Sequence, residues 1–212
     1  MCQAEEPDVV AAILEKLHES KAISSVVVGG SRARGTATAL SDWDIYAEGD
    51  PERMMAEIPA LVASFAPLAA FWEPLSEQAG YMVVMDGPTK VDIFPIGGSR
   101  EIQPPWVLTA DTLPSIDGHF WDWILWLGGK TLRGERQLVA DELVKMHQFL
   151  LRPIGVASAP ASLAEAIASY YEARARAADA LGVAIRPELG RQVSEALQSH
   201  AVLPERRFAN PS

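Results

Sequence analysis

The stretch that decides the fold is Val26-Val27-Val28-Gly29-Gly30-Ser31-Arg32-Ala33-Arg34-Gly35, followed closely by Ser41-Asp42-Trp43-Asp44-Ile45-Tyr46. A short β-branched run that stops at two glycines is typical of a buried strand with a glycine exit. Such a turn brings bare backbone N–H groups close to an anion, and its serine and arginines add a hydroxyl and positive charge. The first stretch therefore predicts phosphate binding, with the candidate residues Gly29, Gly30, Ser31 and Arg32.

The second stretch carries two acids in alternation. Asp42 and Asp44 are two residues apart on a predicted strand, so both side chains leave the same face of the sheet, while Trp43 and Ile45 face the opposite layer. Carboxylates only ~6–7 Å apart along one strand are poorly tolerated unless a cation lies between them. Magnesium fits best, because this hard ion binds carboxylate and phosphate oxygens.

A third acid, Asp92, lies in Lys90-Val91-Asp92-Ile93-Phe94, within another predicted strand. Its neighbours are apolar, and an unpaired buried carboxylate is costly. If this strand lies beside the first, Asp92 would complete a site for two metal ions roughly 3.5–4 Å apart. Asp42, Asp44 and Asp92 are therefore the candidate metal ligands and catalytic residues.

The rest of the chain divides into an α/β half and a helical half. Periodicity and turn residues predict, in the first half, helices over about 7–22 and from Asp50-Pro51 onward, with strands over 24–28, 43–47, 68–72, 81–85 and 90–96. Residues 97–118 are rich in Gly, Pro, Ser and Asp and predict a long loop. Helices follow over 120–127, 139–151, 162–181 and 187–200. We expect two domains, 1–118 and 119–212.

At this point the chain resembles the nucleotidyltransferase superfamily typified by DNA polymerase beta. The family pattern is a Gly-Ser turn after a strand, Asp-x-Asp on the next strand and a third acid on a later one, which here are Gly29, Gly30 and Ser31, Asp42 and Asp44, and Asp92. The resemblance covers about residues 23–96. The helical half resembles the C-terminal helices of small bacterial nucleotidyltransferases that adenylylate antibiotics, on the stretch Trp126-Leu127-Gly128-Gly129-Lys130-Thr131-Leu132-Arg133-Gly134-Glu135.

The resemblance implies a fold and a mechanism. The fold is an N-terminal mixed β-sheet with flanking helices, followed by a helical domain that closes over the nucleotide. Asp42 and Asp44 would hold two magnesium ions, and Ser31 and Arg32 would bind the β- and γ-phosphates. Lys130 could reach the triphosphate or be a solvated helix residue. Asp92 would bind the second ion or take the proton from the acceptor, with Glu135, otherwise a surface ion pair, as the alternative base.

The implied function is transfer of a nucleoside monophosphate, AMP from ATP as the first choice, to a small hydroxylated molecule such as an aminoglycoside or lincosamide. Two alternatives stay open: a protein-modifying minimal nucleotidyltransferase of the antitoxin kind, and a catalytically silent nucleotide-binding module. Trp123 and Trp126 share one helix face, which predicts core packing ahead of a stacking wall for substrate.

Charge and composition limit the classes of partner and the cellular location that we expect. The 212 residues carry a net charge of −10, and residues 1–118 alone hold 18 acidic and 7 basic side chains. Without a basic stripe we expect no nucleic-acid partner, and an acidic cleft would concentrate a cationic acceptor. A single cysteine, Cys2, an acidic N-terminus and the absence of any apolar run of ~20 residues predict a cytoplasmic protein without a membrane span. Oligomeric state stays open, a homodimer included.

Overall fold

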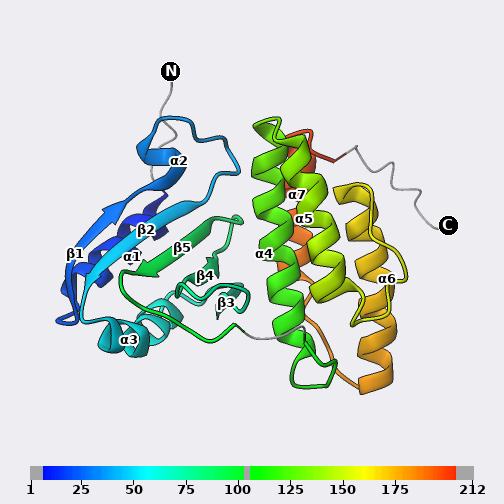
Figure 1. Cartoon of the computed structure of the whole chain (residues 1–212), viewed down its shortest axis with the longest axis horizontal. Coiled ribbons are helices and arrows are strands. Elements are labelled where there is room, and N and C mark those ends of the chain that lie inside the picture. Colours follow the sequence, from blue (N-terminus) through cyan, green and yellow to red (C-terminus); the bar gives the residue numbers. More distant parts are fainter. Residues whose placement is uncertain (1–6, 103–105, 204–212) are drawn as a thin grey trace.

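The computed structural model describes residues 7–102 and 106–203, which form a five-stranded sheet with helices on both faces (Figure 1). The strands lie in the order β1-β2-β5-β4-β3. Their bounds are β1 Ile23–Val28, β2 Trp43–Gly49, β3 Ala69–Trp72, β4 Tyr81–Val84 and β5 Lys90–Pro95. Only β2 and β5 run parallel, and the other neighbours are antiparallel, so the expected mixed sheet is confirmed.

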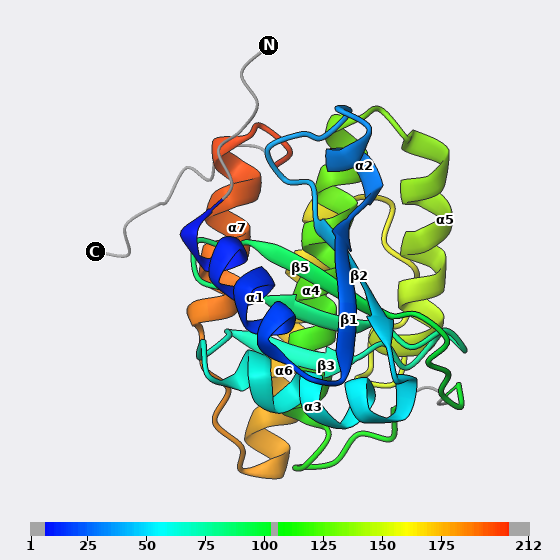
Figure 2. The ribbon, with the colours of Figure 1, turned by 90° about the vertical axis from the view of Figure 1, so that its left-hand side faces the viewer.

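One face of the sheet is covered by α1 (Asp8–Glu19) and α3 (Pro51–Ala63), which lie in front of the strands in Figure 2. Asp50 caps α3 by accepting a hydrogen bond from the Arg53 amide, and Pro51 occupies its first turn, as the sequence predicts. Apolar side chains of both helices pack against alternate residues of the strands, including Trp43, Ile45, Val91 and Ile93. This alternation leaves the residues between them on the other face of the sheet.

The other face packs against the helical half, in which α4 (Leu113–Leu132) is central. It contacts β3, β4 and β5 on one side and α5 (Arg136–Met146), α6 (Leu163–Leu181) and α7 (Glu188–Ser199) on the other. A π-helical turn, η1 (His147–Leu151), continues α5, and the short α2 (Gly30–Ala33) follows β1. Because helices surround α4, most of its residues are buried.

The predicted loop over 97–118 is wrong in its last six residues, because α4 begins at Leu113. Leu113, Ile116 and Phe120 are fully buried at helical spacing. Asp117 is also buried, and its carboxylate is stabilised there by hydrogen bonds that it accepts from the Tyr170 hydroxyl and the Trp121 indole. A polar residue on the core face of a helix hides the apolar periodicity on which the sequence prediction depends.

Helix α4 passes through residue 118 without interruption, and the division into domains at that residue stays a prediction. Cys2, on which the predicted redox environment depends, lies outside the described residues. No helix within residues 7–102 and 106–203 is both long and apolar enough to cross a membrane.

Candidate active site

The three acids singled out in the sequence meet on two neighbouring strands. The parallel register of β2 and β5 places Asp44 directly beside Asp92, and Asp42 immediately precedes β2. One carboxylate oxygen from each of the three lies within 4.8 Å of the others. The expected juxtaposition of the two strands is therefore present, and it follows from a parallel pairing that the sequence does not specify.

The electrostatics of this acid cluster suit a hard cation. Burial, and then the neighbouring charge of Asp42, raise the pKa of Asp44, and burial raises the pKa of Asp92 to about 8. Both raised pKa values mean that the ionised form of each carboxyl is less favourable at this site than it is in water. Three convergent carboxylates are a donor set that magnesium or manganese prefers, and a divalent cation would relieve their repulsion. The residues present therefore fit the metal that the fold family implies.

The two glycines of the turn are explained by their neighbours. Gly30 has a φ of +61°, and a Cβ on it would overlap Asp44 Oδ2. A Cβ on Gly29 would overlap the Tyr46 ring. The glycines thus let the backbone after β1 lie against the carboxylate and the ring of β2. The Ser31 side chain next to them is buried, and its hydroxyl has no hydrogen-bond partner among the described residues.

Arg32 braces the loop that precedes β2. Its guanidinium donates to the carbonyl oxygens of Ser41 (2.5 Å) and Asp42 (3.0 Å) and lies 3.9 Å from the centre of the Trp43 ring. These contacts fix the backbone from which the Asp42 side chain projects. The sequence predicts instead that Arg32 contacts phosphate, and the structure leaves that role as a prediction.

Lys130 of α4 acts on the acid cluster through its charge. Its ammonium lies 4.7 Å from the Trp126 ring centre, and its charge is among those that lower the pKa of Asp44 against the larger opposing effect of burial. Gly128 and Gly129 allow α4 to approach its neighbours closely, because Cβ atoms there would press on Leu197 and on the Leu40 carbonyl oxygen. Gly129 therefore lets α4 lie close to the loop before β2, and Gly128 lets it lie close to α7.

Glu135, the alternative base in the sequence analysis, is held elsewhere. The Arg133 guanidinium donates to it at 2.5 Å, and this ion pair lowers the pKa of Glu135. Arg133 also donates to the Ser41 hydroxyl at 3.3 Å and so joins α4 to the loop before β2. The expected surface ion pair is therefore present.

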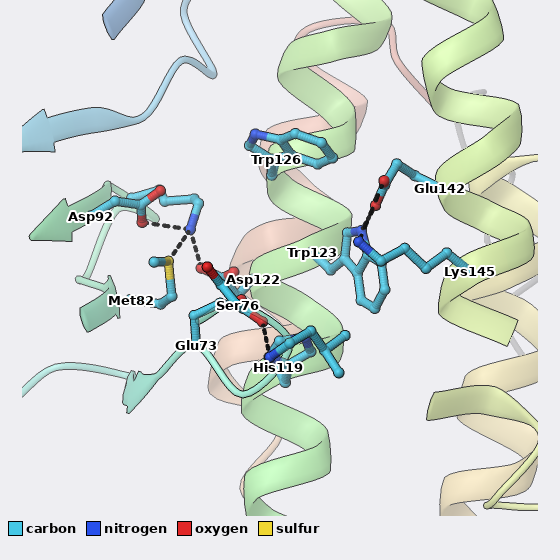
Figure 3. Close-up of a pocket in the computed structure, with 12 residues that line it drawn as sticks. Glu73, Ser76, Met82, Asp92, His119, Asp122, Trp123, Trp126, Glu142 and Lys145 are labelled. Atoms are coloured by element: carbon cyan, nitrogen blue, oxygen red, sulfur yellow. Dashed lines mark hydrogen bonds and ion pairs between the residues drawn. The ribbon is translucent and has the colours of Figure 1, made fainter. Parts of the chain in front are cut away.

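A cavity of about 250 Å³ lies between the sheet and helices α4 and α5, with Asp92 in its wall (Figure 3). Trp123 and Trp126 line its helical side, and Glu142 accepts a hydrogen bond from the Trp123 indole and pairs with Lys145 at 3.7 Å. Trp123 thus belongs to the core, as expected, and also to the cavity wall. The full lining is Glu73, Leu75, Ser76, Met82, Lys90, Asp92, His119, Asp122, Trp123, Trp126, Glu142 and Lys145.

Apart from Asp92, the sequence analysis missed the charged residues of this wall. Lys90 is buried and donates to Asp92 at 2.6 Å and to Asp122 at 2.5 Å. Glu73 is partly buried, and burial raises its pKa. Lys90 could have been found from its place two residues before Asp92 on the same strand face, whereas Asp122 and Glu73 carry no local signal.

The comparisons with known proteins agree with this arrangement in part. Residues 10–79 match the family model described as "Nucleotidyltransferase domain", a range that contains the glycine turn, Asp42 and Asp44. No curated protein matches the chain closely enough in sequence to count as a relative. Among solved structures, an aminoglycoside 6-adenyltransferase from Bacillus subtilis is similar at 11% identity and a TM-score of 0.39, covering 91% of this chain and 97% of that one. The similarity to a nucleotidyltransferase domain therefore covers about a third of the chain, and Asp42 and Asp44 of the acid cluster lie inside the matched range.

Proposed function

We propose that the protein transfers a nucleoside monophosphate, AMP from ATP as the leading case, to a hydroxyl of a small acceptor and releases pyrophosphate. The observation that carries this proposal is the convergence of Asp42, Asp44 and Asp92, because Asp92 also lines a cavity between the sheet and the helical half. Nucleotidyl transfer needs two substrates beside one group of acids, and the cavity gives the second substrate a place there.

Asp42, Asp44 and Asp92 would hold magnesium. When bound, this metal neutralises negative charge on the triphosphate and on the leaving pyrophosphate. The chain supplies the positions of the carboxylates: Trp43 and Ile45 anchor β2 in the core, and Val91 and Ile93 anchor β5 in the same core. Positioning of this kind carries much of the rate in phosphoryl transfer.

The nucleotide would bind at the turn after β1. Gly29 and Gly30 keep the backbone free of side chains there, and the buried Ser31 hydroxyl, without a partner among the described residues, is available to a phosphate oxygen. Lys130 would bind the triphosphate from the opposite side. Arg32 would bind the phosphates only if its guanidinium releases the two carbonyl oxygens to which it donates here. If it keeps these hydrogen bonds, its role is to hold the loop before β2 in place.

The acceptor hydroxyl would enter the cavity beside Asp92. Asp92 takes its proton, the hydroxyl oxygen forms a bond to the α-phosphorus, and the bond from the α-phosphorus to the bridging oxygen of pyrophosphate breaks. We prefer Asp92 to Glu135 as the base because Asp92 lines the cavity, whereas Glu135 is paired with Arg133 outside it.

The cavity favours a cationic acceptor with a ring. Glu73 lies in its wall, and none of the ion pairs within the described residues includes Glu73. Trp126 is a partly buried aromatic surface beside it. A volume of about 250 Å³ is slightly below the roughly 300–1,000 Å³ of ordinary ligand sites, so one end of an acceptor would enter. An aminocyclitol antibiotic of the aminoglycoside kind has this chemistry.

The test is a screen of ATP, GTP, CTP and UTP, each with Mg²⁺, against hydroxylated antibiotics, with pyrophosphate release as the readout. We expect release with ATP and at least one amino-substituted acceptor. Label from α-³²P-ATP on a polypeptide, with the antibiotics unlabelled, would favour the protein-modifying alternative. No Mg²⁺-dependent release with any acceptor or protein would contradict the proposal and leave the silent nucleotide-binding module.

A further inference from the structure

A buried lysine connects the acid cluster to the helical half. The Lys90 ammonium, with 3% of its side chain exposed, donates to Asp92 of β5 at 2.6 Å and to Asp122 of α4 at 2.5 Å. It also lies 3.7 Å from the Met82 sulfur. Figure 3 shows Asp92 and Met82 on the sheet side of the cavity and Asp122 on the α4 side, and all three contact the Lys90 ammonium. Two carboxylates thus share one cation away from bulk water.

The shared cation leaves negative charge behind. Asp92, Asp122 and Lys90 together carry a net charge of −1 when all are ionised. An ammonium paired with Asp92 alone would neutralise the carboxylate that the metal needs. Because Asp122 draws on the same ammonium, Asp92 is only partly neutralised. The Lys90 ammonium donates to Oδ1 of Asp92 and so fixes the orientation of this carboxylate.

This network adjoins the rest of the acid cluster. The Lys90 ammonium holds both Asp92 and Asp122, and Asp92 in turn has a carboxylate oxygen within 4.8 Å of one from Asp42 and one from Asp44. Asp122 is therefore separated from the acid cluster by a single side chain, so its charge can act on a cation held by Asp42, Asp44 and Asp92.

We propose that Lys90 and Asp122 are positioning residues of the metal site: Lys90 orients Asp92, and Asp122 prevents Lys90 from neutralising it. The affinity of the acid cluster for a divalent cation is then set in part by a residue of the helical half. This inference rests on the proposed function, because it takes Asp42, Asp44 and Asp92 as metal ligands.

A purely structural ion pair between β5 and α4 predicts something different. Breaking a buried charge network destabilises a protein whatever its purpose. A structural role would therefore lower the free energy of unfolding without changing metal affinity. Asp117 provides the matched comparison, because it is another buried acid of α4. It accepts hydrogen bonds from Tyr170 and Trp121 and pairs with Arg174, and none of these residues belongs to the acid cluster.

The experiment is a titration of the full chain with Mn²⁺, followed by electron paramagnetic resonance of the free ion, with urea unfolding of each variant in parallel. We expect Asp122→Asn to weaken Mn²⁺ binding by about 10-fold or more, as changes behind metal ligands commonly do. Asp117→Asn should lower the urea midpoint and leave the Mn²⁺ dissociation constant within about twofold of wild type, because its partners lie outside the acid cluster. Asp122→Ser, with the same expected result, replaces Asp122→Asn if that variant is poorly folded.

The outcomes separate this inference from the proposed function. If wild type binds Mn²⁺, Asp44→Asn loses that binding and a folded Asp122 variant binds as wild type does, the positioning role is overturned and the metal site stands. If Asp117→Asn weakens Mn²⁺ binding as much as Asp122→Asn, the effect is one of general stability and the inference is again overturned. If wild type does not bind Mn²⁺, the proposed function and this inference both fail.

Discussion

The position of the Asp44 carboxylate depends on the absence of a side chain at Gly30. Gly30 lies against the Asp44 carboxylate with a φ of +61°, so this carboxylate and the turn occupy adjoining space. The glycine pair in the sequence is therefore explained first by packing against β2, and the open backbone that it offers to an anion is a second consequence. At this scale a single methyl group is enough to disturb the proposed site.

Gly30→Ala should abolish most transfer activity. The new Cβ overlaps Asp44 Oδ2 and must displace the carboxylate, and the positive φ adds a cost of about 1 kcal/mol. Gly35→Ala is the matched control, because Gly35 has a φ of +68° but a methyl group added there would meet no atom within 4 Å. We expect Gly35→Ala to share the loss of stability, measured by urea unfolding, and to keep its activity. Equal activities for the two variants would refute this explanation of Gly30.

His119 makes the stability of the protein sensitive to acid. Burial, and then the charges of Lys90 and Lys145, lower the pKa of His119 to about 3, so the folded state keeps the ring neutral. The unfolded chain binds a proton near pH 6.5. Between these values the unfolded state holds more protons, so stability is full above about pH 6.5 and falls as the pH is lowered toward 3.

Phenylalanine at position 119 should remove this dependence. It keeps an aromatic ring among Phe71, Trp106 and Trp123 and cannot be protonated. Between pH 7 and pH 5 the wild type should lose up to about 2 kcal/mol of unfolding free energy relative to His119→Phe, as measured by urea titration. The same pH dependence in both proteins would show that folding does not lower the pKa of His119.

The acid cluster is predictable from the sequence, and the residues around it are not. Asp42, Asp44 and Asp92 lie in short local patterns in which alternation and apolar neighbours fix the face and the burial of each side chain. Lys90 and Asp122, in contrast, are 32 positions apart and meet only because α4 packs against β5. No local rule encodes a contact that depends on how two separate elements pack.

Among the elements, α4 contributes several of the residues around the candidate site. It supplies Asp122, Trp123, Trp126 and Lys130, and it contacts three strands and three helices. Its first residues escape prediction because Asp117, which is buried through polar partners, interrupts the apolar pattern. The strands are predicted well, because their β-branched runs end at clear turn residues. Their order in the sheet depends on long-range pairing that the sequence does not show.

Gly129→Ala should displace α4 from the loop before β2. Alanine in a helix interior normally adds stability of up to about 1 kcal/mol over glycine. Here its Cβ would lie 2.9 Å from the Leu40 carbonyl oxygen, which is backbone and cannot move alone. We expect a lower melting temperature and a higher KM for the nucleotide, because Lys130 follows directly. A gain in stability with unchanged KM would show that the close approach of α4 is unimportant.

For the whole molecule, the uneven charge is the broadest constraint on the acceptor. The net charge is −10, and the acidic excess lies in the half that carries the acid cluster. A negative cleft concentrates cations. At physiological ionic strength, salt largely screens this attraction between charges more than about 8 Å apart. The acceptor's charge should therefore appear in the salt dependence of the reaction.

KM for an amino-substituted acceptor should rise by several-fold between low salt and about 0.3 M salt, whereas KM for a neutral hydroxylated acceptor should change little. Steady-state rates at fixed Mg²⁺ and nucleotide measure both. Because salt also screens nucleotide binding, nucleotide is kept saturating throughout. An equal response of the two acceptors would remove the electrostatic argument for a cationic substrate.

The most direct test of the account is Mg²⁺-dependent pyrophosphate release by wild type and by Asp44→Asn, with thermal unfolding of both. Burial and the neighbouring Asp42 make the charged Asp44 unfavourable, so the neutral asparagine should leave the melting temperature equal or higher. We predict that Asp44→Asn folds and releases no pyrophosphate above background. A folded Asp44→Asn protein with near wild-type release would contradict the assignment of Asp42, Asp44 and Asp92 as the catalytic centre.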